Sequence, residues 1–217
     1  MTTKRIFLDG QTATPEDFYE FFKDFVTTDD YVAGDWTITN AGSGTVAIAT
    51  AAAGGQLVLT GGAADDALLA LNNKIEAFKF VAGKKLYFSA RFKINDATQS
   101  DLVIGLQITD TTPLAVSDGI FFRKDDGDAL LDFVASKNST ESVKTGVATL
   151  ANDTFVTAAF YYDGAVLRAF VDNVAVGDLP LTNVVDDEEL CISIAVQNGE
   201  AVSKVLTVDF IRALAER

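Results

Sequence analysis

Residues 154–173 read TFVTAAFYYDGAVLRAFVDN, and this stretch decides the fold class. Two runs of β-prone residues flank Asp163-Gly164, and Asp172-Asn173 follows nine positions later. Both dipeptides are typical of two-residue hairpin turns, because Asp, Asn and Gly tolerate the backbone conformations that such turns require. The spacing therefore predicts a three-stranded antiparallel meander whose middle strand lies between the two turns.

Short β-prone stretches separated by Gly, Asp and Asn continue from Tyr31 to the end of the chain. In residues 86–94, apolar and polar residues alternate, which is typical of a strand with one buried face. This organisation predicts an all-β fold, a sandwich or barrel. The expected strands are 35–40, 45–50, 56–60, 67–71, 86–94, 102–110, 119–124, 130–136, 141–143, 155–162, 166–171, 174–178, 189–197 and 204–213.

One amphipathic helix is expected near the N-terminus. Thr14 can cap it, Pro15 suits its first position, and the phenylalanines that follow are spaced by three and four residues. We therefore divide the chain into an N-terminal arm with a helix, 1–30, and a sandwich domain, 31–217. The Phe-rich face can either cover the sandwich or contact a partner. The candidate partner-binding residues are Phe18, Phe21, Phe22 and Phe25.

The composition narrows the possible partners. The 217 residues carry a formal net charge of −14, which disfavours nucleic acid because its phosphates would repel the chain. Hydrophobic residues make up 48% of the sequence, and the mean hydropathy of +0.21 excludes a disordered chain. No run of apolar residues is long enough to suggest a membrane span, so we expect no membrane partner.

The meander resembles the concanavalin-A-like, laminin-G-like jelly roll. In that family a hydrophobic strand is followed by Asp-Gly and then by Leu-Arg-x-aromatic-Val-Asp-Gly, which residues 155–173 match except that Asn173 replaces the last Gly. The run 206–212, LTVDFIR, is similar to the last strand of that fold, which commonly carries an Asp. The resemblance covers about the last third of the chain and implies a jelly-roll sandwich of two antiparallel sheets.

The overall order of segments is similar to proteins encoded among tailed-phage virion genes. The likeness lies in a Phe-rich N-terminal segment, Asp29-Asp30-Tyr31, Gly34-Asp35-Trp36 and a Gly/Ala-rich hairpin before the jelly-roll strands. It implies a capsid decoration protein, made in the bacterial cytoplasm and located in the virion. Its partners would be the major capsid protein and copies of itself. The alternative is a carbohydrate-binding, lectin-like module of a tail fibre or host-recognition spike.

Catalytic groups are scarce in the sequence. It has no histidine and a single cysteine, Cys191, in an apolar run that favours a buried thiol. The paired carboxylates that glycosidases of this fold place on one strand face are missing, and the acidic run 186–189 fits a solvated turn. We therefore expect no catalytic residues, with a carboxylate-dependent glycosidase or lyase as the least favoured alternative.

Three further features are weighed as binding sites. Asp125, Asp126 and Asp128, with Asp132, offer oxygen ligands to calcium, although a plain turn is the favoured interpretation and no cofactor is assigned. Trp36 can stack on a sugar, but core packing is favoured. The tyrosines 161 and 162 lie on opposite faces of one strand, so at most one can face a ligand.

Overall fold

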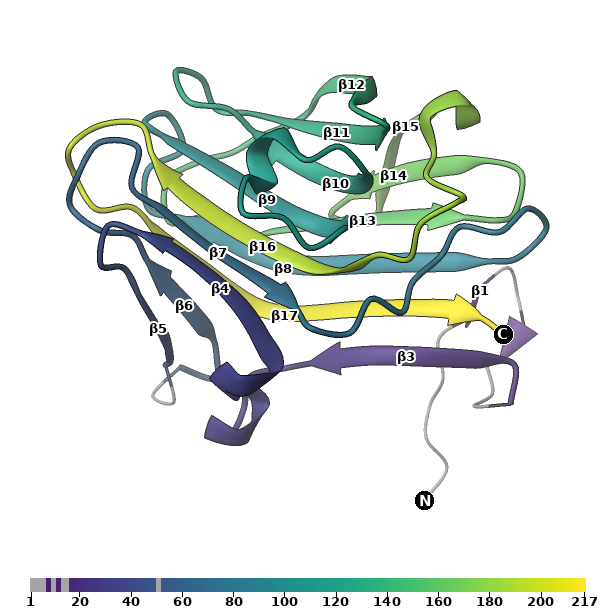
Figure 1. The fold of residues 1–217 in the computed structure, drawn as a ribbon, viewed down its shortest axis with the longest axis horizontal. Helices are drawn as coiled ribbons and strands as arrows, with labels where there is room; N and C mark the ends of the chain where they lie inside the picture. The colour runs from purple at the N-terminus through teal and green to yellow at the C-terminus, as the bar shows by residue number, and fades with distance from the viewer. Residues whose placement is uncertain (1–6, 9–10, 13–15, 50–51) are drawn as a thin grey trace.

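The computed structural model describes residues 7–8, 11–12, 16–49 and 52–217. Two antiparallel sheets pack face to face, and a two-stranded hairpin, β1 (Phe7–Leu8) and β2 (Gln11–Thr12), lies at the N-terminal end (Figure 1). The all-β jelly-roll sandwich expected from the sequence is confirmed. Within the described residues, no helix is long and apolar enough to cross a membrane.

One sheet has seven strands in the order β12-β11-β10-β9-β16-β7-β4. Every pair of neighbours is antiparallel. The four strands β9 to β12 are neighbours in sequence, whereas β16, β7 and β4 join the sheet from distant parts of the chain. In chain order the strands are β4 (Trp36–Ala41), β7 (Leu68–Asn73), β9 (Ser100–Gln107), β10 (Gly119–Lys124), β11 (Leu130–Lys137), β12 (Thr140–Thr149) and β16 (Cys191–Asn198).

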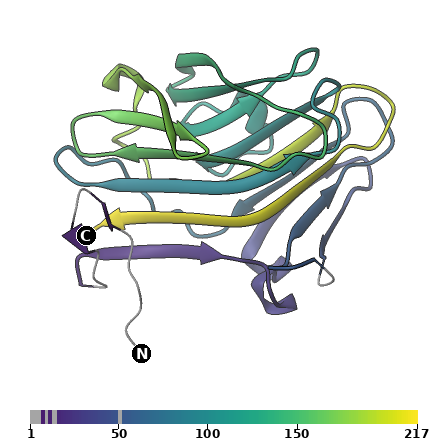
Figure 2. The ribbon, with the colours of Figure 1, turned by 180° about the vertical axis from the view of Figure 1, so that it is seen from behind.

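The second sheet has eight strands, seven of them in the order β15-β14-β13-β8-β17-β6-β5, while β3 pairs with the other half of β17. Figure 2 shows β17 running between β8 and β3. The strands are β3 (Phe18–Lys23), β5 (Thr45–Ile48), β6 (Leu57–Thr60), β8 (Leu86–Ile94), β13 (Val156–Tyr162), β14 (Leu167–Val171), β15 (Val174–Leu179) and β17 (Val205–Glu216). Short 3-10 turns lie at Thr28–Asp30, Ala33–Asp35, Pro113–Ala115 and Leu181–Asn183.

The predicted meander is present as β13, β14 and β15. At its first turn the Asp163 carboxylate accepts hydrogen bonds from the backbone N–H groups of Ala165 and Val166 at 2.8 and 2.7 Å. At its second turn Asp172 and Asn173 have positive φ angles of 47° and 66°. Asn173 thus adopts the left-handed conformation for which the family usually has Gly.

The core lies between the sheets and is rich in phenylalanine. Phe88 and Phe160 stack with ring centroids 5.1 Å apart, and Phe133 from the opposite sheet lies 5.7 Å from Phe160. All three side chains are fully buried, as is Leu167 on the inward face of β14. The alternation in 86–94 therefore identifies the buried face of β8.

The aspartate within the last strand has a structural explanation. β17 has a bulge between Val208 and Phe210, where its register with β8 shifts by one residue. Asp209 at the bulge forms an ion pair with Arg91 at 2.6 Å, and the Arg91 guanidinium lies 4.1 Å from the centre of the Phe155 ring. The bulge turns a carboxylate out of an otherwise apolar strand, as bulges do.

The expected N-terminal helix is wrong where the structure describes it. Residues 18–23 form β3, an extended strand that pairs with β17 from Lys23 opposite Ile211 to Phe18 opposite Glu216. Aromatic residues have high β propensity, and pairing with β17 satisfies the backbone groups of both strands, which outweighs a short helical spacing. Thr14 and Pro15 lie outside the described residues, and the boundary at residue 30 stays a prediction.

Other strand boundaries agree to within about three residues, with one clear exception. The segment expected as 141–143 belongs to a longer strand, Thr140–Thr149, whose side chains are mostly exposed. Because β12 is an edge strand with little apolar alternation, its length follows from pairing with β11 rather than from its own pattern.

Candidate functional site

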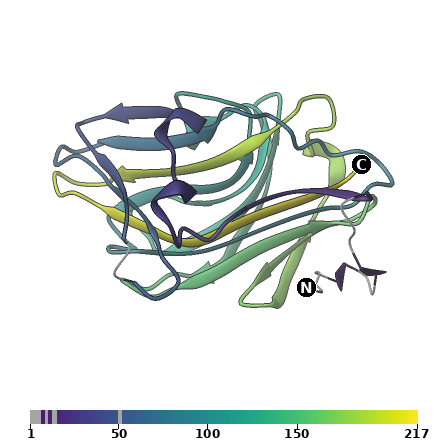
Figure 3. The same cartoon turned by 90° about the horizontal axis from the view of Figure 1, so that it is seen from below.

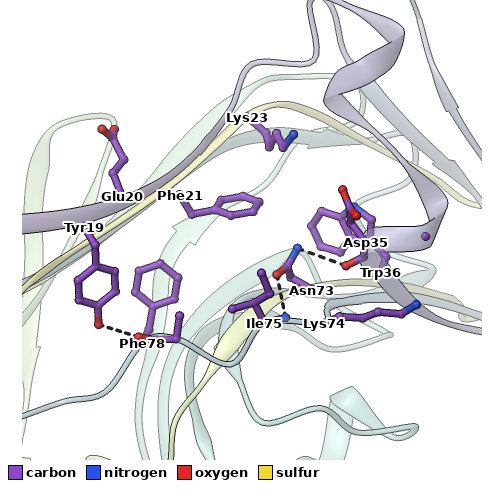
Figure 4. A pocket seen from close by; sticks show the side chains of 12 residues that line it. Tyr19, Glu20, Phe21, Lys23, Asp35, Trp36, Asn73, Lys74, Ile75 and Phe78 are labelled. Carbon is purple, nitrogen blue, oxygen red and sulfur yellow. Dashed lines mark hydrogen bonds between the residues drawn. The ribbon is translucent and has the colours of Figure 1, made fainter. Parts of the chain in front are cut away.

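A groove with a volume of about 420 Å³ opens at the side of the sandwich, between β3 and the chain that follows β7 (Figure 4). That volume is within the usual range of small-molecule sites, about 300–1,000 Å³. Figure 3 shows β3 running beside β17 at this side of the molecule. The lining residues are Tyr19, Glu20, Phe21, Lys23, Gly34, Asp35, Trp36, Asn73, Lys74, Ile75, Ala77 and Phe78.

The aromatic part of the groove comes from strand alternation in β3. Tyr19 and Phe21 are two residues apart and face the same side of the strand. Tyr19 stacks on Phe78 with ring centroids 5.6 Å apart, and Phe21 meets Trp36 edge-on at 6.3 Å. Across from Phe21, Ile75 is 70% exposed (Figure 4). The groove therefore has an apolar floor that remains accessible at Phe21 and Ile75.

Hydrogen bonds fix the two walls. The Tyr19 hydroxyl donates to the carbonyl oxygen of Ala77 at 2.6 Å, which ties β3 to the opposite wall. The Asp35 carbonyl accepts from the backbone N–H of Lys74 at 2.9 Å and from the Asn73 side chain at 3.4 Å. Burial raises the pKa of Tyr19, which keeps its hydroxyl in the neutral, donating form. These bonds fix the distance between the two walls.

The rim is polar and carries both signs of charge. Lys23, Asp35 and Lys74 border the groove, and no ion pair involves them in the part of the chain that the structure describes. Glu20 differs, because it lies on the other face of β3 and pairs with Arg212 at 2.6 Å. The groove thus offers two ammonium groups and one carboxylate that are not engaged with each other.

The four phenylalanines expected at a partner surface are separated by the strand. Phe21 lines the groove, whereas Phe22 points to the opposite side, is 50% exposed and lies 5.7 Å beneath the Arg212 guanidinium. Phe18 is half-buried, and Phe25 is fully buried in the core. Phe25 therefore cannot contact a partner from the folded protein.

Trp36 and the two tyrosines also have definite places. Trp36 is only 3% exposed and belongs to the core, so the interpretation that it stacks on a sugar is wrong and core packing is confirmed. Tyr162 is buried, with its hydroxyl donating to Gly164, while Tyr161 is half-buried on the other face of β13. The sequence did not single out Tyr19 and Ile75, which line the groove.

The acidic clusters are engaged in structural contacts. Asp125 pairs with Arg123 at 3.3 Å, and Asp128 and Asp132 each accept a backbone N–H, at 2.7 Å. Asp186, Asp187 and Glu189 pair with lysines on the surface. In the described part of the chain, no three His, Cys, Asp or Glu side chains converge as a metal site would require.

The single thiol is buried, as expected. Cys191 lies in β16 with no exposed surface, and burial raises its pKa to about 11. Its neighbours include Thr109, whose hydroxyl oxygen is 3.8 Å from the sulfur. A thiol with this pKa stays protonated near neutral pH, so Cys191 is a poor nucleophile.

No protein-family model matches the sequence, and no curated protein matches it. Solved structures do match in three dimensions. A protein of unknown function from Shewanella oneidensis aligns with a TM-score of 0.63 and 15% identity, covering 92% of this chain and 87% of that one. The Bacillus licheniformis beta-glucanase aligns with a TM-score of 0.63 and 13% identity, covering 89% and 97%.

A carbohydrate recognition domain, that of Emp46p, aligns with a TM-score of 0.57 and 12% identity, covering 88% of this chain and 94% of that one. Identities this low establish shared architecture and not shared chemistry. The chain therefore has the concanavalin-A-like jelly-roll fold found in glucanases and in a carbohydrate recognition domain.

Proposed function

We propose that the chain binds carbohydrate in the groove between β3 and residues 73–78. The observation that carries the proposal is the accessible apolar floor at Phe21 and Ile75, beside three charged side chains that are free to contact a ligand. The fold supports it, since structures of this architecture include a carbohydrate recognition domain. Of the three functions considered from the sequence, the lectin-like module is the one that this groove favours.

A sugar ring matches the chemistry of this groove. One face of the ring presents C–H groups that pack on an aromatic side chain such as Phe21, while its hydroxyl groups need hydrogen-bond partners at the edge. Lys23 and Lys74 supply donors and Asp35 supplies an acceptor. Because the Tyr19 and Asp35 hydrogen bonds already fix the walls, binding would require little ordering of the protein.

We further propose that binding occurs without cleavage. Glycoside hydrolysis needs two carboxyl groups facing the same bond, about 5–10 Å apart. Of the two carboxylates nearest the groove, that of Glu20 points to the other face of β3, where it pairs with Arg212, and Asp35 is left as the one carboxylate on the groove side among the described lining residues. The enzymes among the structural neighbours make catalysis the competing function, and the experiment below includes it as an outcome.

A glycan array followed by calorimetric titration of the strongest ligand tests this proposal. We expect Phe21→Ala to weaken binding at least tenfold, about 1.4 kcal/mol, because it removes the accessible aromatic ring of the floor. Phe22→Ala is the matched control: it removes the same side chain from the other face of β3 and should leave affinity unchanged.

Three results would contradict the proposal. They are no bound glycan in the presence or absence of calcium, equal loss of binding in Phe21→Ala and Phe22→Ala, and release of shorter sugars from the bound polysaccharide. The capsid-decoration role, the virion location and the contact with a major capsid protein stay predictions from the resemblance. Electron microscopy of purified particles would test them.

A further inference from the structure

One side of the sandwich is built from a long uncharged stretch. From Trp36 to Ala64 the sequence has no Asp, Glu, Lys or Arg, although 22% of the chain is charged. This stretch forms β4, the last strand of the seven-stranded sheet, and β5, the last strand of the other sheet. Figure 1 shows both edges on the same side of the molecule. That side therefore has two neutral sheet edges in a protein of net charge −14.

The open edge of β4 presents backbone groups to solvent. In the register of β4 with β7, Trp36 lies opposite Asn73, and Asp35 therefore lies opposite Lys74. The N–H of Lys74 donates to the Asp35 carbonyl, which makes these two residues a hydrogen-bonded pair. Bonded and non-bonded pairs alternate along an antiparallel ladder. The N–H and C=O groups of Ile38 and Asn40 therefore point away from β7. In the described part of the chain, β4 pairs with β7 alone.

The opposite side of the sandwich shows how a protein protects such edges. There β12 carries Glu141 and Lys144, and β15 carries Asp178, which pairs with Arg168. Both edge strands have irregular registers with their neighbours. Charges and bulges on edge strands discourage pairing with another chain. β4 has neither: its register with β7 is continuous over six residues, and Ile38 is 41% exposed.

We propose that β4 pairs antiparallel with β4 of a second copy, joining two seven-stranded sheets across a two-fold axis. Two chains of charge −14 repel each other, so contact is favoured where no charge must be buried. A two-fold axis also places the same strand of both copies side by side in antiparallel orientation, so that each can pair with the other. With Thr39 opposite Thr39, Ile38 of each copy exchanges both backbone hydrogen bonds with Asn40 of the other.

Sedimentation equilibrium tests the interface with two matched lysine substitutions. Thr39→Lys places two ammonium groups against each other at the axis and should weaken the dimer at least tenfold, about 1.4 kcal/mol. Thr45→Lys adds the same charge to an exposed position of β5 and should leave the dimer intact. Raising the NaCl concentration should strengthen the wild-type dimer, because salt screens the repulsion between the copies.

A disulfide trap tests the register independently. Facing residues in a non-bonded antiparallel pair have Cα atoms about 4.5 Å apart, close enough for a disulfide. Thr39→Cys should therefore form a covalent dimer on mild oxidation, whereas Thr45→Cys should not. Cys191 is fully buried and will not contribute an exposed thiol.

The proposal is overturned by a wild-type chain that stays monomeric at about 100 µM, a concentration at which an interface of even modest affinity forms. It is also overturned by a dimer that Thr45→Lys disrupts as strongly as Thr39→Lys, or by one that salt dissociates. Cross-linking through Thr45→Cys in place of Thr39→Cys would assign the contact to β5. None of these results depends on whether the groove binds a glycan.

Discussion

At the scale of single residues, one buried lysine is held by two carboxylates at one end of the sandwich. Lys204 is 1% exposed, and its ammonium group donates to Asp96 at 2.8 Å and to Glu200 at 2.6 Å. Burial alone would lower the pKa of Lys204, but these two carboxylates raise it. Backbone hydrogen bonds, from Gln99 first, together with Lys204 lower the pKa of Asp96 to about 2.

The Asp96 pKa predicts a specific pH dependence. Because the folded state lowers this pKa, its stabilisation is complete above the unfolded value near 4 and is lost as the pH falls toward about 2. Asp96→Asn should reduce the free energy of unfolding by about 2 kcal/mol at pH 7. The difference from wild type should shrink by pH 3. At that pH the Asp96 carboxyl is largely protonated in the unfolded chain, so the folded state keeps only part of the stabilisation that it has at pH 7.

Urea denaturation at the two pH values measures this difference. Glu188→Gln provides the control, since Glu188 is exposed and has no ion pair within the described residues. It should change stability by less than about 0.5 kcal/mol. An Asp96→Asn variant with the same deficit at pH 3 as at pH 7 would show that the carboxylate charge is not what stabilises this end.

At the scale of elements, β3 makes a prediction that separates a strand from a helix. In the strand, Phe22 faces outward and is half-exposed, whereas Phe25, just beyond it, is fully buried. Phe22→Ser should cost no more than about 1 kcal/mol, the size of its exposed contact with Arg212, while Phe25→Ala should cost about 3–5 kcal/mol. On a helix these residues would share one apolar face, and both substitutions would be costly. Thermal or urea denaturation distinguishes the two cases.

The same element shows what the sequence could and could not predict. The bounds of β8 and β10 follow from the sequence to the residue, because the alternation in β8 and the short apolar run in β10 are local signals. The aromatic run of β3 fits both a helical and an extended period, and only its pairing with β17, nearly two hundred residues later, decides between them. The groove was missed for the same reason, since β3, Trp36 and residues 73–78 meet only through the topology of the sheets.

At the scale of the whole molecule, the stabilising core lies between the two sheets, whereas the proposed binding surfaces lie along one side of the sandwich. Their inward faces form the phenylalanine-rich core, and the acidic clusters on the surface are held by lysine, arginine or backbone N–H groups. Along the uncharged side the edges of the sheets remain open, and the groove lies beside β4. Sequence composition predicted the acidic surface, but it could not locate the opening between the two sheets.

Titration of ¹⁵N-labelled protein with the strongest ligand from the array tests the central claim most directly. The claim is that the groove beside β3 is where this chain meets carbohydrate. We predict that the amide resonances that shift will cluster at Phe21, Lys74 and Ile75, with little change along β12 and β15. Shifts confined to β12 and β15, or scattered evenly over the surface, would contradict it.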